Sequence, residues 1–117
     1  MQLSGDFKVM DVKGTDYRGI VRLEMSSESG VSLALEYPRN AVGVDIKQGD
    51  NVRVSISNEK DPNYSSNWDV YMNGVVYYVG GNNVKISIGG GLLMDVNNFK
   101  NDVKVGEKVY IGLKVLR

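Results

Sequence analysis

The sequence contains no cysteine and no histidine. Without cysteine the chain cannot form the disulfides on which small secreted scaffolds depend. The two absences together exclude Cys/His zinc fingers, thiolate nucleophiles, Ser-His-Asp triads and acid–base catalysis by imidazole. The carboxylates on predicted strands form no recognisable catalytic pair. We therefore expect no enzyme active site, no metal site and no cofactor.

Long apolar runs and an excess of one charge are also missing. No run approaches the roughly 20 apolar residues that span a bilayer, and 14 basic residues balance 14 acidic ones. Balanced charge argues against a protein held on nucleic acid by bulk electrostatics. Residues 1–6 lack the basic start and apolar core of a signal peptide. We expect a cytoplasmic protein with no membrane partner.

Alanine, the best helix former, occurs only at Ala34 and Ala41, whereas glycine occurs 14 times and tyrosine seven times. This composition favours strands and turns over helices. A chain of 117 residues has the length of one domain. We expect a single all-β domain over residues 1–117.

Apolar residues alternate with polar ones along most of the chain, which is the pattern of half-buried antiparallel strands. Val52, Val54 and Ile56, for example, are separated by polar residues. Gly74 is expected to mark a bulge or kink in the longest strand. The pattern predicts eight strands, at residues 7–13, 20–25, 31–37, 52–57, 68–79, 84–88, 92–96 and 109–116. Eight such strands are typical of an all-β barrel or sandwich.

A polar loop at residues 58–67 divides the chain into two halves that end in similar segments. Residues 46–56 align without gaps on residues 103–113, sharing a lysine, a glycine-centred turn followed by an acidic residue, and an alternating strand. Either an internal repeat or convergence on the few residues that make good turns explains this likeness. In both cases it suits a barrel of two four-stranded halves.

Two motifs in the second half resemble a known family. Residues 71–77 read Tyr-Met-Asn-Gly-Val-Val-Tyr, and residues 90–94 read Gly-Gly-Leu-Leu-Met. Both are similar to hallmarks of the small OB-fold subunit of DNA-directed RNA polymerases, the eighth subunit in eukaryotes and the G subunit in some archaea. Looser similarity at residues 7–12, 22–24 and 33–36 extends the resemblance over most of the chain.

The resemblance implies an eight-stranded antiparallel barrel of OB-fold type, built from two four-stranded halves. It implies a non-catalytic subunit of an archaeal-like polymerase, itself a nucleotidyltransferase complex, that docks on the largest subunit and supports assembly and stability. Contact with DNA or RNA would be indirect or weak, no small-molecule substrate is implied, and the subunit would be nucleoid-associated through the polymerase. A shorter N-terminus, a shorter central loop and Asp95 in place of a basic residue distinguish this chain from the eukaryotic form.

The resemblance also marks the residues expected to bind the partner. They are Tyr71, Gly74, Tyr77, Gly90, Gly91, Leu92, Leu93 and Met94. Tyr71 and Tyr77 would share one face of a strand, in the core or at an interface. On a strand, Leu92 and Met94 point one way and Leu93 the other, so Leu93 either contacts a partner or lies under one of the chain's own loops.

A second function remains open from the residues alone. Tyrosines lie beside arginines at residues 17–18 and 37–39, and aromatic side chains interleaved with basic ones bind single-stranded nucleic acid on small OB barrels. The alternative to the polymerase subunit is therefore a free single-stranded nucleic-acid-binding OB-fold protein.

Overall fold

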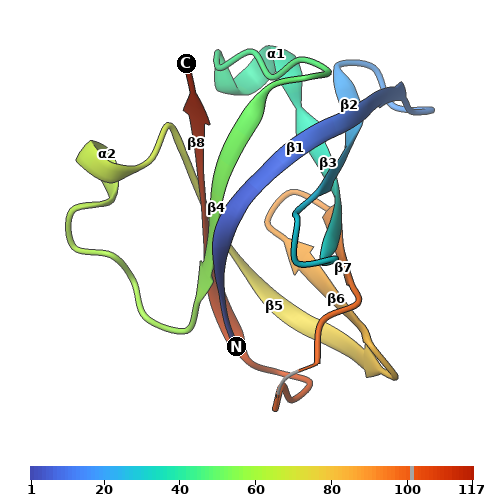
Figure 1. Cartoon of the computed structure of the whole chain (residues 1–117), viewed down its shortest axis with the longest axis vertical. Helices are drawn as coiled ribbons and strands as arrows, with labels where there is room; N and C mark the ends of the chain where they lie inside the picture. Colours follow the sequence, from blue (N-terminus) through green and yellow to red (C-terminus); the bar gives the residue numbers. More distant parts are fainter. Residues whose placement is uncertain (101) are drawn as a thin grey trace.

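The computed structural model describes residues 1–100 and 102–117 and forms a closed barrel of eight antiparallel strands (Figure 1). Within these residues, no helix is long and apolar enough to cross a membrane. The two helices, α1 (Arg39–Val42) and α2 (Tyr64–Asn67), have one turn each. The strands are β1 (Gln2–Gly14), β2 (Ile20–Ser26), β3 (Ser32–Pro38), β4 (Asn51–Ser57), β5 (Val70–Gly80), β6 (Asn83–Ile88), β7 (Leu92–Asn97) and β8 (Lys108–Leu116).

All eight predicted strands are confirmed, with three corrections of detail. β1 begins at Gln2 rather than at Phe7, because its first part pairs with β4 and its second part with β2. The bulge in β5 lies between Val76 and Tyr78, not at Gly74. The helical turns were not predicted, because four residues are too few to show a helical period; α2 lies inside the predicted loop at 58–67.

The barrel consists of two halves that are contiguous in space as well as in sequence. Around the barrel the strands follow the order β1-β2-β3-β7-β6-β5-β8-β4. One half is therefore β4-β1-β2-β3 and the other β8-β5-β6-β7, each with the order of a Greek key. Two ladders join the halves, β3–β7 and β4–β8.

The two halves also share their strand registers. The alignment of residues 46–56 on 103–113 places Ser55 on Gly112, and these two residues pair with each other in the β4–β8 ladder. The bulge in β1 follows Val9, and the bulge in β5 follows Val76. Each of these valines exchanges backbone hydrogen bonds with the turn before the last strand of its half. The barrel therefore has an approximate two-fold axis, and every strand of one half has an equivalent in the other.

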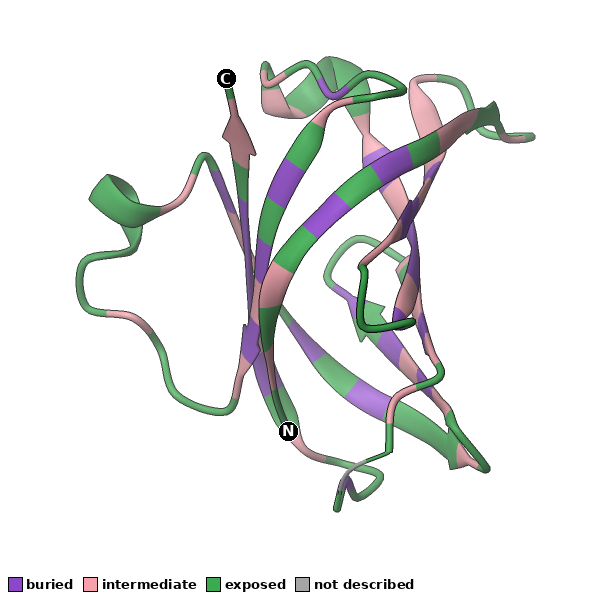
Figure 2. Ribbon diagram, in the orientation of Figure 1, coloured by how far each residue is buried: buried purple, intermediate pink, exposed green. Residues whose placement is uncertain are grey.

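Inward-facing side chains fill the barrel. Along β1 and β4, buried and exposed residues alternate in bands (Figure 2), as period-two patterning requires. Twenty-five apolar residues are buried, and none of the buried residues described is polar or charged. Burial of apolar surface at about 25 cal/mol per Å² is the main term that stabilises such a core.

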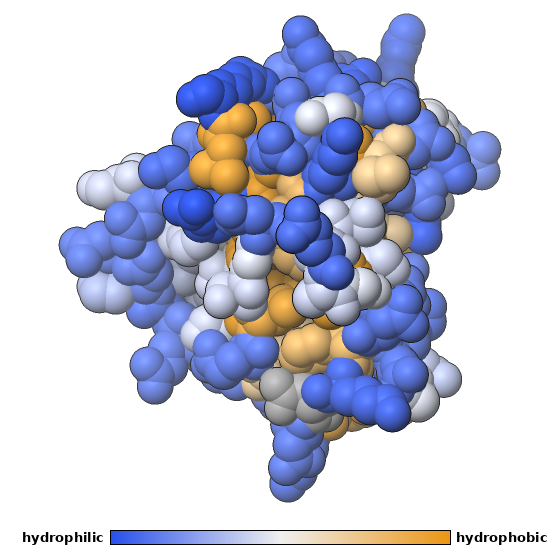
Figure 3. Space-filling model, viewed as in Figure 1, coloured by the Kyte–Doolittle hydropathy of each residue, from blue (hydrophilic) through white to orange (hydrophobic). Residues whose placement is uncertain are grey.

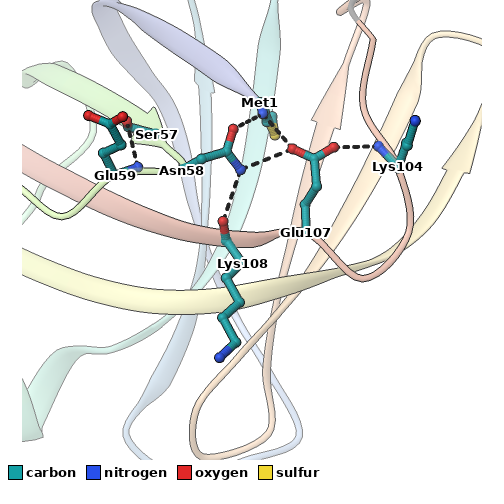
Figure 4. Close-up of polar contacts among 7 residues, drawn as sticks. All are labelled: Met1, Ser57, Asn58, Glu59, Lys104, Glu107 and Lys108. Carbon is teal, nitrogen blue, oxygen red and sulfur yellow. Dashed lines mark hydrogen bonds and ion pairs between the residues drawn. The ribbon is translucent and has the colours of Figure 1, made fainter.

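The turns before β4 and β8 show how the halves differ in polar contacts. Asp50 accepts the N–H of Lys47 at 2.9 Å, and its equivalent Glu107 accepts that of Lys104. Asp50 has one further partner, the Arg117 guanidinium at 3.5 Å. Glu107 has two closer ones, the Met1 ammonium group at 2.6 Å and the Asn58 side-chain amide at 3.0 Å (Figure 4). The ammonium group and these donors lower the pKa of Glu107 to about 2. This cluster ties the first strand to the second half of the barrel.

Candidate partner-binding surface

An apolar row runs across the outer side of the second half. Val75 on β5 pairs with Ser87 on β6, which pairs with Leu93 on β7, so the three side chains lie side by side on one face. Val75 is 41% exposed and Leu93 is 42% exposed. The expectation that Leu93 points away from the core is confirmed, and Leu93 is not covered by a loop of this chain.

The bulge in β5 adds two aromatic rings to this row. In a bulge two residues oppose one on the partner strand, and here the register shifts between Val76 and Tyr78. Tyr77 and Tyr78 are consequently both on the surface, 43% and 46% exposed. A regular strand would have turned one of them into the barrel.

Lys85 lies beside these tyrosines without being a free cation. Its ammonium group lies 6.0 Å from the centre of the Tyr78 ring and 2.7 Å from the Asp95 carboxylate. The hydrogen bond to Asp95 raises the pKa of Lys85. Arg22 approaches the other oxygen of Asp95 at 3.6 Å, so this border of the apolar surface carries two cations that share one carboxylate.

The glycine turn at residues 89–91 joins β6 to β7 next to the row. Gly90 and Gly91 adopt φ angles of 86° and 79°, which favour glycine because other residues are strained there. A Cβ atom on any of the three glycines would meet nothing within 4 Å. The turn therefore presents bare backbone that another chain can approach closely.

Leu93 is held in place through its backbone. Its N–H donates a hydrogen bond of 2.7 Å to the Glu36 carboxylate, beyond the point where the β3–β7 ladder ends at Leu35 and Met94. The side chain of Glu36 thus replaces the missing ladder partner. The Leu93 side chain is therefore exposed although its backbone N–H has a hydrogen-bond partner.

Three residues predicted to bind a partner belong instead to the barrel interior. Met94 is buried in the core, and Leu92 is partly buried against it. Gly74 is also buried. A Cβ atom there would lie only 2.8 Å from both the Ile86 side chain and the Ser87 carbonyl oxygen. Met94 and Gly74 cannot touch a partner; the motif marks them because it includes inward as well as outward positions.

Tyr71 lies on the same outer face as Tyr77, but its ring and hydroxyl already contact other residues of this chain. Its ring stacks on Tyr64 of the central loop at 5.2 Å and on Tyr110 of β8 at 6.1 Å. Its hydroxyl accepts the Asp61 N–H at 2.9 Å. Tyr71 therefore anchors the central loop rather than facing a partner.

Asp61 organises the same loop. Its carboxylate accepts hydrogen bonds from the Asn63 backbone, the Asn67 amide and the Trp68 indole at 2.8, 2.9 and 3.0 Å. The bonds from Asn67, Asn63 and Trp68 lower the pKa of Asp61. Trp68 in turn covers Gly112, whose Cβ position its ring occupies. The loop at 58–67 is a structured cover over β5 and β8.

The surface left for a partner thus differs from the predicted set. We call it the outer patch; it consists of Val75, Tyr77, Tyr78, Leu93 and the turn at 89–91. Val75 was missed in the sequence because the motif spans it without marking it, and Tyr78 because it lies one residue beyond the motif. The available signal was apolar residues on both sides of β5, where a half-exposed strand should alternate.

The equivalent row in the first half is polar. The shared registers place Lys8 on Val75, Ser26 on Ser87 and Ser32 on Leu93. The same backbone therefore folds with a lysine and a serine where the outer patch has valine and leucine. The fold does not require apolar residues at these positions.

Among the described residues, no three acidic side chains gather where they could hold a metal ion. Comparison with known proteins gives no match: no family model fits this sequence, and no curated protein is significantly similar to it.

Proposed function

We propose that this chain is a non-catalytic subunit of a DNA-directed RNA polymerase and docks on the largest subunit through the outer patch. The observation that carries the proposal is the contrast between the apolar row Val75–Ser87–Leu93 and its polar equivalent in the first half. Exposed apolar side chains that the fold does not need are typical of a surface that another protein covers.

The location and composition of the outer patch support this role. Tyr77, Gly90, Gly91 and Leu93 belong to the two motifs that resemble the polymerase subunit. Aromatic residues such as Tyr77 and Tyr78 are enriched among the residues that dominate binding energy. Full burial of a side chain such as Leu93 contributes roughly 1.5–3 kcal/mol.

The alternative, a free single-stranded nucleic-acid-binding protein, has less support. Tyr71 stacks between Tyr64 of the chain's own loop and Tyr110 of β8, so the faces of these rings are partly used. Lys85, the cation nearest Tyr78, is paired with Asp95. Stacking platforms for bases combine open aromatic faces with unpaired cations.

The test is co-purification from source cells with tagged wild-type, Leu93→Asp and Ser32→Asp chains. Ser32→Asp is the matched control, because Ser32 is the equivalent of Leu93 in the first half. We expect Leu93→Asp to reduce recovery of the large polymerase subunits at least tenfold, because a carboxylate would be buried unpaired at the interface. We expect Ser32→Asp to recover them as wild type does.

Thermal unfolding of both purified variants checks that the barrel is intact. Equal recovery of polymerase by folded Leu93→Asp would contradict the outer patch as docking surface. Wild-type chain that recovers no polymerase would contradict the proposed function, and nuclease-sensitive nucleic acid in its place would support the alternative.

A further inference from the structure

β1 leaves part of its backbone unpaired. It pairs with β4 from Gln2 to Lys8 and with β2 only from Lys8 to Gly14. The segment from Gln2 to Phe7 therefore has a neighbouring strand on one side only. Such an edge is a template for another extended chain.

The direction of the unpaired groups follows from the bonds of Val9. Val9 donates to the Asp50 carbonyl and accepts from the Gly49 N–H, both on the β4 side. Backbone groups alternate sides along an antiparallel strand. The N–H and C=O groups of Ser4 and Asp6 thus point to the open side, away from β4.

A groove runs along this edge. Its volume is about 840 Å³; residues 4–8 of β1 form one wall and Ser26–Ser29, at the turn after β2, form the other. β1 and this turn both face the viewer in Figure 1, and Figure 3 shows hydrophobic residues in the middle of the same face between hydrophilic ones. The groove therefore has polar walls, and the exposed side chain of Met10 gives it an apolar contact.

The shape of the ligand follows from the backbone and not from the volume. The unpaired N–H and C=O groups on this wall of the groove belong to a single strand, β1, and an extended chain is the ligand that can pair with them.

We propose that this groove binds an extended peptide segment of a partner protein, which adds as a strand to β1 on the side opposite β4. The backbone groups of Ser4 and Asp6 supply the pairing, as in other complexes formed by strand addition. One set of alternate side chains of the peptide faces the groove, where Met10 is exposed, and the other set faces away from it.

Charges on the two walls define the outward side chains that fit. Asp6 is paired with Arg53 at 2.9 Å, whereas Lys8 and Glu28, on opposite walls, form no ion pair within the described part of the chain. A segment with an acidic residue near Lys8 and a basic residue near Glu28 complements both. This surface lies in the first half and does not depend on the outer patch.

The first experiment identifies the segment. A photo-crosslinking amino acid replaces Ser27 in the groove wall or, as a control, Ser65 in the central loop, which is exposed and lies outside both the groove and the outer patch. The chain is expressed in source cells, and mass spectrometry then maps the crosslinked peptide. We expect one continuous segment of about five residues with alternating apolar positions, captured from Ser27 and not from Ser65. No captured peptide, a captured nucleic acid, or contacts scattered over a folded surface would overturn the proposal.

The second experiment tests strand pairing with a synthetic peptide of that segment. Ser4→Pro removes an N–H that faces the groove, at a position where an edge strand tolerates proline, while Ser4→Ala removes only the hydroxyl. We expect Ser4→Pro to weaken binding at least tenfold and Ser4→Ala less than twofold. Equal affinity of the folded Ser4→Pro chain would overturn the proposal.

A second pair of variants leaves β1 untouched in case Ser4→Pro unfolds. Ser27→Trp fills the groove from the opposite wall, and Ser27→Ala keeps it open. We expect loss of peptide binding for Ser27→Trp alone. Unchanged binding by Ser27→Trp would likewise overturn the proposal.

Discussion

The two halves of the barrel share their registers, bulges and entry turns, yet their outer sides differ. Inside the barrel, equivalents remain apolar, as for Val9 and Val76 or Met25 and Ile86. Outside it, Lys8 and Ser32 stand where the other half has Val75 and Leu93. The comparison separates what the fold demands, which is an apolar interior, from what each half presents to its surroundings.

One pair of equivalents differs inside the core. Phe7 pairs with Val52 in the first half, and Gly74 pairs with Val109 in the second. Phe7 fills the barrel with an aromatic ring, whereas at Gly74 the Ile86 side chain occupies the space a Cβ would need. At this equivalent position the interior is filled by a large side chain, Phe7, in the first half, and by a neighbouring side chain, Ile86, over the small Gly74 in the second.

The largest effect is expected for Phe7→Ala, which makes the first half resemble the second at this position. Phe7 is 2% exposed, and removal of a buried ring costs about 3–5 kcal/mol because nothing nearby refills the cavity. Urea unfolding followed by tryptophan fluorescence measures the loss. A cost below about 1 kcal/mol would mean that the interior of the first half can repack as the second half does.

A smaller effect is expected for Gly74→Ala, which moves the second half toward the first. The added methyl group would meet the Ser87 carbonyl oxygen as well as Ile86, and overpacking of this kind costs about 1–3 kcal/mol. Gly5→Ala is the matched control in β1, because its Cβ would make an ordinary contact at 3.8 Å with Phe7. Equal unfolding free energies for the two variants would show that close packing at Gly74 is unimportant.

The smallest effect is expected for Glu107→Gln and depends on pH. Because the pKa of Glu107 is lowered from 4.5 to about 2, its carboxylate stabilises the fold above pH 4.5, and this contribution is lost as pH falls toward 2. The group is partly exposed, so we expect a cost of about 1 kcal/mol at neutral pH.

Chemical denaturation of wild type and Glu107→Gln between pH 7 and pH 2 should show two stability curves that converge at low pH. Asp50→Asn is the control at the equivalent turn, where the carboxylate is paired with the Arg117 guanidinium at 3.5 Å and not with the Met1 ammonium group. A wild-type advantage that persists unchanged at pH 2 would rule out ionised Glu107 as its source.

The strands were predictable from sequence because each half-buried strand repeats a two-residue pattern, as Val52, Val54 and Ile56 do. The closed barrel followed from the number and order of strands and from the resemblance. The position of the bulge after Val76 could not be predicted, because it depends on how β6 pairs with β5. The residue type at position 77 gives no signal of it. The start of β1 was missed because the first residues, up to Asp6, contain only one apolar residue after Met1.

The outer patch was only partly predictable. The outward direction of the Leu93 side chain was predicted from alternation, and the turn at 89–91 from its glycines. Tyr71 was not separable from Tyr77 in the sequence, since both lie on the same face and only the fold of the central loop shows that Tyr64 stacks on Tyr71. The polar row in the first half could be recognised as the equivalent of the apolar row only from the strand registers, which the sequence does not show.

The central loop is the covalent connection between two halves that pair through matching ladders. If two molecules opened at this loop and exchanged halves, the two ladders that join the halves, β3–β7 and β4–β8, would form again between chains, which is the condition for domain swapping. The loop is fastened to its own barrel by Asp61, Trp68 and the Tyr64–Tyr71 stack. These contacts hold the connection in its closed path, and they would have to break before two molecules could exchange halves.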